Sequence, residues 1–304
     1  MTQNIPVMLR YYVKILFLLS VSLSTFGQEA ILNSPFWVNK AYVNPSYVGD
    51  YQKPVYDALF TTKQLWVGID GAPRVNGMAL NNKFNRKNAV GLQLWQHAYG
   101  ALNYSSVSIP YSFNAQIDRR QGFSLGLTPT YTTTTLDLSQ ITRPERFDLE
   151  TPIPDVRFLD ASFGAHYYYD DIFRFGLFAS NLMINGNINS DEVINYTNYS
   201  MSSYGADISF YLNENRYRHL SLLIDGYIKF NPYTPPIAEI SIRSGEKGSF
   251  IGLGYRSNQD VNIIIQMGNN DRFNFGYIYT YSISALQQYS NGSNQVYLKF
   301  RLPH

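Results

Sequence analysis

Apolar and polar residues alternate along most of this chain, and the alternation is clearest between residues 272 and 283. Because a strand sends alternate side chains to opposite faces, this segment predicts a strand with one apolar and one polar face. The apolar face carries Phe273, Phe275, Tyr277, Tyr279, Tyr281 and Ile283. The opposite face carries Asn274, Gly276, Thr280 and Ser282.

Alternating segments recur from residue 57 onward at the spacing of about ten residues that is typical of membrane-spanning strands. Charges fall on the face opposite the apolar one, as Asp225 and Lys229 do. The apolar faces fit either a soluble sandwich, packed on a second sheet, or a membrane barrel, facing lipid. The pattern predicts fourteen strands, at residues 57–67, 74–82, 88–98, 103–115, 121–135, 159–169, 172–182, 199–213, 219–230, 236–244, 248–257, 260–268, 272–284 and 293–302.

The lengths of the connections distinguish these two classes. The two long connections, 136–158 and 183–198, both have odd numbers when connections are counted from the first hairpin. Outer-membrane barrels keep short turns on the periplasmic side and long loops outside. The sequence therefore predicts an all-β, antiparallel up-and-down transmembrane barrel with both termini in the periplasm. The even-numbered connections are short and charged, at residues 83–87, 118–120, 170–171, 214–218, 245–247 and 269–272.

Composition agrees with a barrel in lipid. Charged residues make up 15% of the chain and aromatic residues 16%, including 26 tyrosines. The mean hydropathy of −0.22 excludes a helical membrane protein. A net charge of +2 gives no support for a nucleic-acid partner. The absence of cysteine excludes disulfides, thiolate metal sites and a lipoprotein anchor.

The first 27 residues predict a cleaved secretory signal peptide, and therefore export to the outer membrane. Arg10 and Lys14 supply positive charge, residues 15–23 form a short apolar core, and Thr25 and Gly27 are small residues before the cleavage site. A membrane anchor is the alternative, but the apolar run is too short to span a bilayer.

Residues 28–56 predict an N-terminal arm, either periplasmic or luminal, that precedes the barrel at residues 57–304. Pro45 and Pro54 argue against a central strand in this region, because proline cannot donate a backbone hydrogen bond to a neighbouring strand. The sequence leaves open whether the arm fills the barrel or reaches a partner.

Candidate chemistry is sparse, and we expect no enzyme activity, no cofactor and no metal. His97 and His166 fall on luminal faces, His219 lies at a turn and His304 ends the chain. A serine hydrolase needs a Ser–His pair and a group that orients the histidine, and a lipase needs it on the lipid-facing surface. Asp191 and Glu192 are too few carboxylates for a typical calcium site.

The inward-facing charges have both signs, which favours cross-strand pairs over the single-sign ring of a selectivity filter. These residues are Arg174, Asp207, Asp225, Lys229, Glu239, Arg243, Lys299 and Arg301. Outward-facing tyrosines predict interfacial girdles rather than a sugar-binding surface. They include Tyr167, Tyr169, Tyr277, Tyr279 and Tyr281.

Two stretches near the N-terminus are not explained by strand alternation. Residues 42–49 read YVNPSYVG, and residues 64–74 read QLWVGIDGAPR. Their Asn-Pro and Gly-Ala-Pro sequences favour fixed turns, while Trp66 and Arg74 place an aromatic ring and a charge near strand ends. Both stretches are candidate partner-binding or structural motifs, and the alternative is that both simply terminate strands.

These stretches resemble the N-terminal pattern of the PorP/SprF family of type IX secretion system outer-membrane proteins. In the second stretch Leu65 is inserted between the matching Gln and Trp, and the final strand is similar except that Gln295 replaces a commonly acidic residue. The matching residues are Tyr42, Asn44, Pro45, Tyr47, Gly49, Gln64, Trp66, Gly68, Gly71, Ala72, Pro73 and Arg74.

The resemblance implies a barrel without catalytic activity that supports the secretion or surface anchoring of large adhesin-like cargo, in some cases for gliding motility. It also implies periplasmic ring components or peptidoglycan-binding proteins as partners, in addition to the lipid bilayer. An outer-membrane channel for small solutes is the main alternative.

Overall fold

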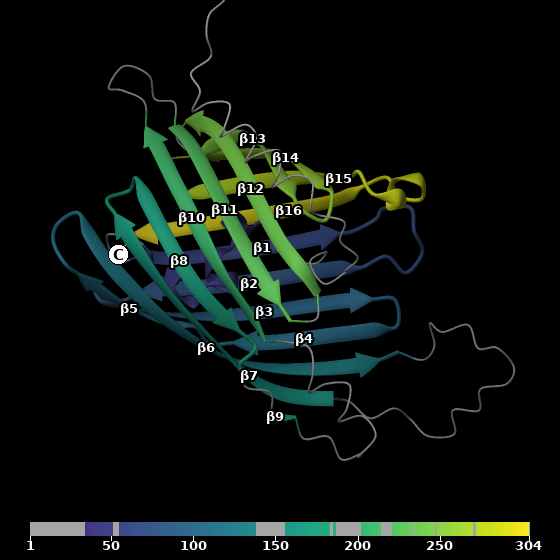
Figure 1. Ribbon diagram of the computed structural model, residues 1–304, viewed down its shortest axis with the longest axis horizontal. Coiled ribbons are helices and arrows are strands. Elements are labelled where there is room, and N and C mark those ends of the chain that lie inside the picture. Colours follow the sequence, from purple (N-terminus) through teal and green to yellow (C-terminus); the bar gives the residue numbers. More distant parts are fainter. Residues whose placement is uncertain are drawn as a thin grey trace, which may run out of the picture.

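The computed structural model describes residues 34–50, 55–137, 156–182, 185–186, 202–213, 221–232, 234–246, 248–269 and 272–303. Its strands form one antiparallel sheet that closes into a barrel (Figure 1). The sheet closes where strand β1 (Val55–Gln64) pairs with strand β16 (Ser293–Pro303) along the full length of β1. The predicted fourteen-stranded antiparallel barrel is confirmed.

Apart from the short β9, which pairs with β7, and from β4 and β5, which share one position, consecutive strands are neighbours in the sheet, as in the up-and-down topology predicted from the short connections. The first half contains β2 (Arg74–Lys83), β3 (Asn88–Tyr99), β4 (Leu102–Ser108), β5 (Tyr111–Gln116), β6 (Gln121–Leu136), β7 (Val156–Tyr169), β8 (Phe173–Ser180) and the short β9 (Asn185–Gly186). The second half contains β10 (Ser203–Asn213), β11 (Ser221–Asn231), β12 (Thr234–Glu246), β13 (Ser249–Arg256), β14 (Asp260–Asn269) and β15 (Phe273–Ser282).

The strand predicted at residues 103–115 is divided in two at Pro110. Strands β4 and β5 together occupy one position between β3 and β6, because each pairs with both of these neighbours. Pro110 has no N–H group, so it cannot continue the hydrogen-bond ladder. Its carbonyl still accepts a hydrogen bond from Gly91 of β3, at 2.7 Å, which keeps the two halves aligned.

Side chains alternate between lumen and outer surface as the sequence predicts. On β15, Asn274, Ile278 and Thr280 are buried in the interior, whereas Phe273 and Tyr281 are exposed on the outside. Exposed apolar side chains cover the outer face of most described strands. This is the surface that a barrel presents to lipid.

The two ends of the barrel differ in their connections. One end, here called the turn end, carries the short connections at residues 84–87, 117–120 and 170–172. The other, here called the loop end, carries residues 65–73 and 283–292, the latter including the 3-10 helix η5 (Ala285–Gln288).

Several predictions fall outside the described residues. They concern the signal peptide at residues 1–27, His219, His304, the Asp191–Glu192 pair, and most of the long connections 136–158 and 183–198. Within those connections the structure describes Leu136 at the end of β6, Asp137 after it, Val156–Phe158 at the start of β7, and β9.

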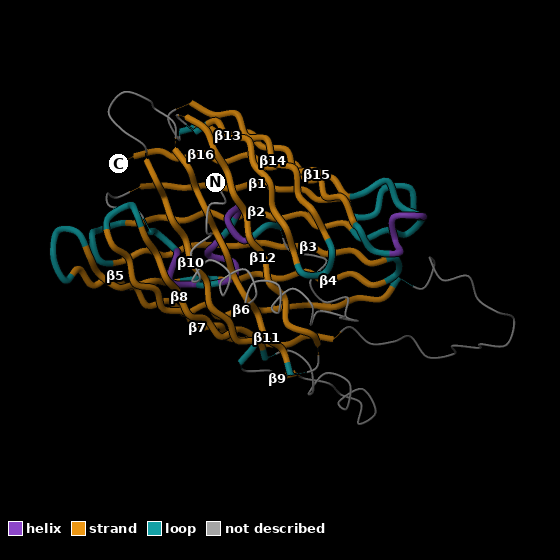
Figure 2. Tube along the Cα trace, turned by 45° about the horizontal axis from the view of Figure 1, so that its top comes forward, coloured by secondary structure: helices purple, strands orange, loops and turns teal. Residues whose placement is uncertain are grey.

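The described part of the arm lies inside the barrel and forms short helical turns (Figure 2). These are η2 (Phe36–Val38), α2 (Lys40–Val43) and η3 (Pro45–Tyr47). Most side chains between residues 34 and 50 are buried, several of them against inward-facing residues of the strands. Among the described residues, no helix is long and apolar enough to cross a membrane.

Candidate functional site

The centre of the arm is a tight turn at Asn44 and Pro45. Pro45 starts the helical turn η3, where its fixed φ angle is favourable and its missing N–H is not needed. The side-chain oxygen of Asn44 accepts hydrogen bonds from the backbone N–H of Ser46, at 3.2 Å, and from the Ser46 hydroxyl, at 2.6 Å. The Asn-Pro-Ser sequence therefore specifies this turn locally.

A row of glycines on the barrel wall makes room for the turn. Gly126 of β6 and Gly164 of β7 face each other in register, and Gly176 lies on the next strand, β8. A Cβ atom at Gly126 would collide with the backbone of Pro45, and one at Gly164 would collide with the side chain of Asn44. Glycine at these inward positions lets the arm backbone approach the wall closely.

Asp207 of β10 holds the same turn through its carboxylate. The Asn44 side-chain amide donates a hydrogen bond to it at 2.9 Å, and the Tyr47 hydroxyl donates another. Asp207 is 2% exposed, so its oxygens depend on protein donors for their hydrogen bonds. Two of the family-like residues, Asn44 and Tyr47, thus anchor the arm to one buried acid.

Lys40 anchors the arm to the same strand, β10, and to its neighbour β11. Its Nζ lies 2.6 Å from Asp225 of β11, and it donates hydrogen bonds to Ser209 at 2.6 Å and to Tyr211 at 3.1 Å. Asp225 also pairs with Arg243 of β12. Removing Lys40 or Arg243 would leave the buried Asp225 carboxylate with one positive charge fewer beside it, which is costly in a low-dielectric interior.

The C-terminal end of the arm is fixed near the turn end by Asp50. Its carboxylate accepts a hydrogen bond from Arg174 Nε at 2.6 Å and lies 3.5 Å from His166 Nε2. Burial by itself raises the pKa of Asp50, but the charge of Arg174 and the contact with His166 outweigh it and hold that pKa well below its usual range.

Ser46, His166 and Asp50 come together in the order of a serine-hydrolase triad, which the sequence analysis did not predict. Ser46 Oγ lies 2.9 Å from His166 Nδ1, and His166 Nε2 faces Asp50. However, the Ser46 hydroxyl donates its proton to Asn44, so His166 Nδ1 is left to donate to Ser46 rather than to accept from it. Ser46 is also fully buried, and the Tyr47 ring stacks on His166 with 4.3 Å between the ring centroids. This geometry orders the arm and does not activate a nucleophile.

The first turn of the arm contacts strands β12 and β16. The Phe36 N–H donates to Glu239 of β12 at 3.0 Å. The ring of Trp37 packs against Tyr297 of β16, with the Arg243 guanidinium 4.0 Å from the ring centroid. These contacts combine hydrophobic packing with a cation–π interaction.

The predicted cross-strand charge pairs are present for four of the inward-facing residues. Arg243 pairs with Asp225, Glu239 pairs with Arg256 at 2.5 Å, and Arg301 lies 3.6 Å from Asp57. The prediction is wrong for Arg174 and Asp207, which bond to the arm instead. The physical reason is that the arm supplies closer partners than the neighbouring strands do.

The second family-like stretch forms the connection between β1 and β2 at the loop end. Val67 exchanges backbone hydrogen bonds of 2.8 Å with Asn291 and Gly292, so the connection is tied to the loop before β16. Gly68 and Gly71 have φ angles of 99° and 72°, a region that favours glycine. The Gly-Ala-Pro part then turns the chain into β2, where Arg74 faces outward and donates to Gln64 at 3.0 Å.

The two stretches meet through their aromatic residues. Tyr42 of the arm lies 4.6 Å from Trp95 of β3 between ring centroids. Trp95 belongs to a buried cluster with Leu65 and Val75, against which Tyr42 and Trp66 also pack. The arm and the β1–β2 connection therefore share one hydrophobic contact near the loop end.

Gly49 closes the arm with a φ of 66°, and a Cβ there would collide with Ala89 of β3. Next to it, the Ser112 hydroxyl of β5 donates to the Val48 carbonyl. Within the described part of the chain, no group of three or more His, Cys, Asp or Glu residues is placed to hold a metal ion.

The fold and the occupied lumen define a class, a fourteen-stranded outer-membrane barrel that holds its own N-terminal segment inside. Residues 25–300 match the family described as type IX secretion system membrane protein PorP/SprF. The chain belongs to this family, and it is an outer-membrane protein.

Solved structures share the barrel fold at low sequence identity. The monoaromatic hydrocarbon channel CymD is 12% identical, with a TM-score of 0.50 over 88% of this chain and 93% of that chain. The outer membrane protein Omp33 of Acinetobacter baumannii is 6% identical, with a TM-score of 0.48 over 83% of this chain and 99% of that chain. Among curated proteins, none matches the sequence.

Proposed function

We propose that this protein is a non-enzymatic component of the type IX secretion system that supports the secretion or surface anchoring of large adhesin-like cargo, and gliding motility where the cell glides. Membership of the PorP/SprF family over residues 25–300 supports the secretion role. The filled lumen is the observation that supports a role as neither an enzyme nor a channel.

The arm crosses the lumen between distant parts of the wall. Ser34 accepts a hydrogen bond from Gln295 of β16 at 2.6 Å, and Phe36 donates to Glu239 of β12. Further along, Val48 bonds to β5 and Asp50 to β8. A barrel obstructed in this way suits a scaffold that binds proteins at its two ends better than a pore.

The proposed partners besides lipid are the cargo and periplasmic ring or peptidoglycan-binding proteins. Asn44 and Tyr47 bond to Asp207 inside the lumen, so their proposed role is to hold the arm, and partner binding falls to the ends of the barrel. At the turn end, the exposed charges of Arg86, Lys87 and Arg120 offer such a surface. Residues 1–27 are proposed to be the cleaved signal peptide.

The test is surface display of cargo in a strain whose chromosomal copy is deleted. We expect deletion to remove the adhesin from whole cells, measured by antibody labelling, and the wild-type gene to restore it. Unchanged display in the deletion strain would contradict the proposed role. A gene carrying Gly226→Ala should restore display as well as the wild-type gene does, because a Cβ at this outward position makes only ordinary contacts of 3.5 Å.

A channel for small solutes is the second candidate, and the likeness to CymD shows only the shared fold. The filled lumen argues against it, because solutes would have to pass the buried contacts of the arm. Electrical recording separates the two functions directly.

A further inference from the structure

The outer face of β2 has an unusually short apolar band. Its outward side chains are Arg74, Asn76, Met78, Leu80 and Asn82. Only Met78 and Leu80 among them are apolar. Asn76 and Asn82 are six residues apart, which is about 15 Å along the membrane normal for a strand rising 3.3 Å per residue at a tilt of about 40°. The apolar band of an outer-membrane barrel is about 25 Å tall.

Other strands keep apolar side chains at the same distance from the turn end. Thr62 of β1, Asn76 of β2 and Ile228 of β11 each lie seven residues from the turn end of their strands, at Val55, Lys83 and Ser221. On β11 the outward face is still apolar at Phe230, two residues further. The polar positions on β1 and β2 are therefore a local feature and not the general level of the membrane boundary.

The polar positions form a continuous row across neighbouring strands. Register places Thr62, Asn76, Gln96, Ser105 and Thr133 side by side on β1, β2, β3, β4 and β6. The Thr62 hydroxyl donates to the Asn76 side chain at 2.9 Å. Two residues nearer the turn end on each strand, a parallel row is apolar. It consists of Phe60, Met78, Leu94, Val107 and Tyr131.

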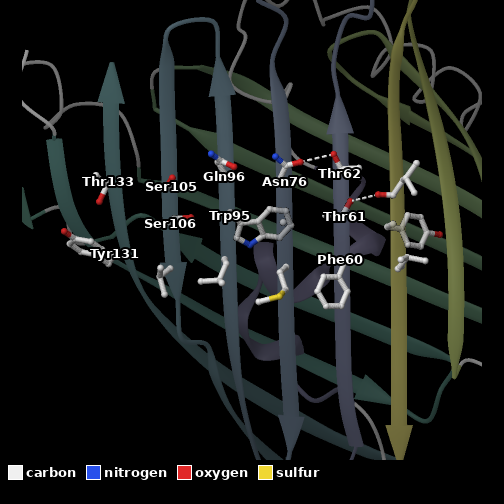
Figure 3. Close-up of a pocket in the computed structure, with 17 residues that line it drawn as sticks. Phe60, Thr61, Thr62, Asn76, Trp95, Gln96, Ser105, Ser106, Tyr131 and Thr133 are labelled. Carbon is white, nitrogen blue, oxygen red and sulfur yellow. Dashed lines mark hydrogen bonds between the residues drawn. The ribbon is translucent and has the colours of Figure 1, made fainter. Parts of the chain in front are cut away.

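A groove of about 700 Å³ runs over these two rows on the outer surface (Figure 3). In this view Thr62, Asn76, Gln96 and Ser105 lie along its loop-end side, and Phe60 lies towards the turn end. On β1 and β2 this order, polar towards the loop end and apolar towards the turn end, is that of one leaflet of a bilayer. The row rises towards β6, where Thr133 lies twelve residues from the turn end of its strand at Gln121. Above the row, the guanidinium of Arg74 supplies a positive charge on the same outer face.

We infer that phospholipid headgroups of the loop-end leaflet settle on this polar row, so that the bilayer is locally thinner against β1 and β2. Amide and hydroxyl groups facing acyl chains are costly, and phosphate and glycerol oxygens would satisfy them. Arg74 at the rim complements the phosphate charge. Barrels with a short apolar band are accommodated by such thinning.

The size of the depression follows from the last apolar residue on each strand. Phe60 lies five residues from the turn end of β1, whereas Phe230 lies nine residues from that of β11. Four residues correspond to about 10 Å along the membrane normal. The apolar–polar boundary is therefore about 10 Å nearer the midplane at β1 than at β11.

The chain has no cysteine, so single cysteines can report the depth of chosen positions. Variants Thr62→Cys, Asn76→Cys and Ile228→Cys are spin-labelled and reconstituted in vesicles of phosphatidylethanolamine and phosphatidylglycerol. The collision rates of each label with oxygen and with a water-soluble nickel chelate are then compared. We expect labels at 62 and 76 to collide mainly with nickel, as at headgroup depth, and the label at 228 to collide mainly with oxygen.

Oxygen-dominated collisions at 62 and 76, equal to those at 228, would overturn the inference. Shielding of 62 and 76 from both reagents would also overturn it, because a second protein copy would then cover the row. As a further check, a label at Gln96→Cys is compared with and without Thr62→Leu and Asn76→Leu. The leucines should move this label towards the oxygen-rich interior, and no movement would count against lipid on the row. Heat-dependent gel migration verifies that each variant forms a barrel.

Discussion

At the scale of single residues, the position of the arm depends most on Asp207. Its buried carboxylate accepts hydrogen bonds from Asn44 and from Tyr47, and the neighbouring glycines leave space for Asn44 and for Asp207 itself. A buried carboxylate without donors is costly, so the arm and the wall stabilise one another. Asn44 and Tyr47, both from the family-like stretch, therefore hold the arm against one buried acid.

Replacing Tyr47 by Phe removes one of these donors and leaves the ring in place. We expect the docked arm to lose about 1–3 kcal/mol, the usual cost of leaving a buried acceptor unsatisfied. Hydrogen exchange of the backbone amides at residues 34–50 measures this loss as faster exchange. Tyr42→Phe is the matched control, because the Tyr42 hydroxyl has no hydrogen-bond partner among the residues that the structure describes. Equal exchange in both variants would show that the bond to Asp207 does not hold the arm.

The contacts of single residues could be predicted only in part. Mixed inward charges predicted pairs such as Arg243–Asp225, because strand alternation fixes which side chains share the lumen. The Ser46–His166–Asp50 arrangement could not be predicted, since it joins the arm to a strand more than a hundred residues away. One signal was present: Gly126, Gly164 and Gly176 all fall on inward positions, where glycine indicates the approach of another backbone.

At the scale of elements, strand alternation predicted the barrel well, because the two faces meet different solvents. The arm followed no such pattern. Its helical turns are short, and their position is set by the wall rather than by an amphipathic repeat. Pro110 was visible in the sequence, yet pairing on both sides of it was needed to show that β4 and β5 share one place in the sheet.

Gly164→Val displaces the arm without changing the arm's own sequence. The added side chain would occupy the space of the Asn44 side chain, so we expect residues 34–50 to become open to protease in folded, membrane-inserted protein. Limited proteolysis with mass spectrometry identifies the cleavage sites. Gly226→Ala, on the outer face of β11, should leave the arm protected. If Gly164→Val stays as resistant as this control, the glycine row is not what seats the arm.

Gly68→Ala tests the connection between β1 and β2. At a φ of 99°, a residue with a Cβ is strained by about 1–2 kcal/mol. We expect the backbone hydrogen bonds between Val67 and the 291–292 segment to open more often, which faster amide exchange at Val67 and Asn291 would report. Exchange rates that match the wild type would show that the loop tolerates the side chain and that the glycine is not required by this conformation.

At the scale of the whole molecule, the barrel is closed by the β1–β16 pairing and obstructed by residues 34–50. The parity of short and long connections was enough to predict a membrane barrel, since only insertion from one side sorts loops in this way. It could not decide whether the lumen was open, because a lumen of about fourteen strands is wide enough for a pore when nothing fills it. Contacts between the arm and strands β3, β5, β7, β8, β10, β11, β12 and β16 supplied that answer.

The central claim, that the arm closes the lumen, is tested most directly by single-channel recording in planar bilayers. Wild-type protein is compared with a variant that lacks residues 34–50, at equal amounts of heat-modifiable barrel. The account predicts no stepwise conductance for the wild type and stable steps for the variant, because removing the arm opens a water-filled path. A wild-type protein that conducts as strongly as the arm-deleted variant would contradict it.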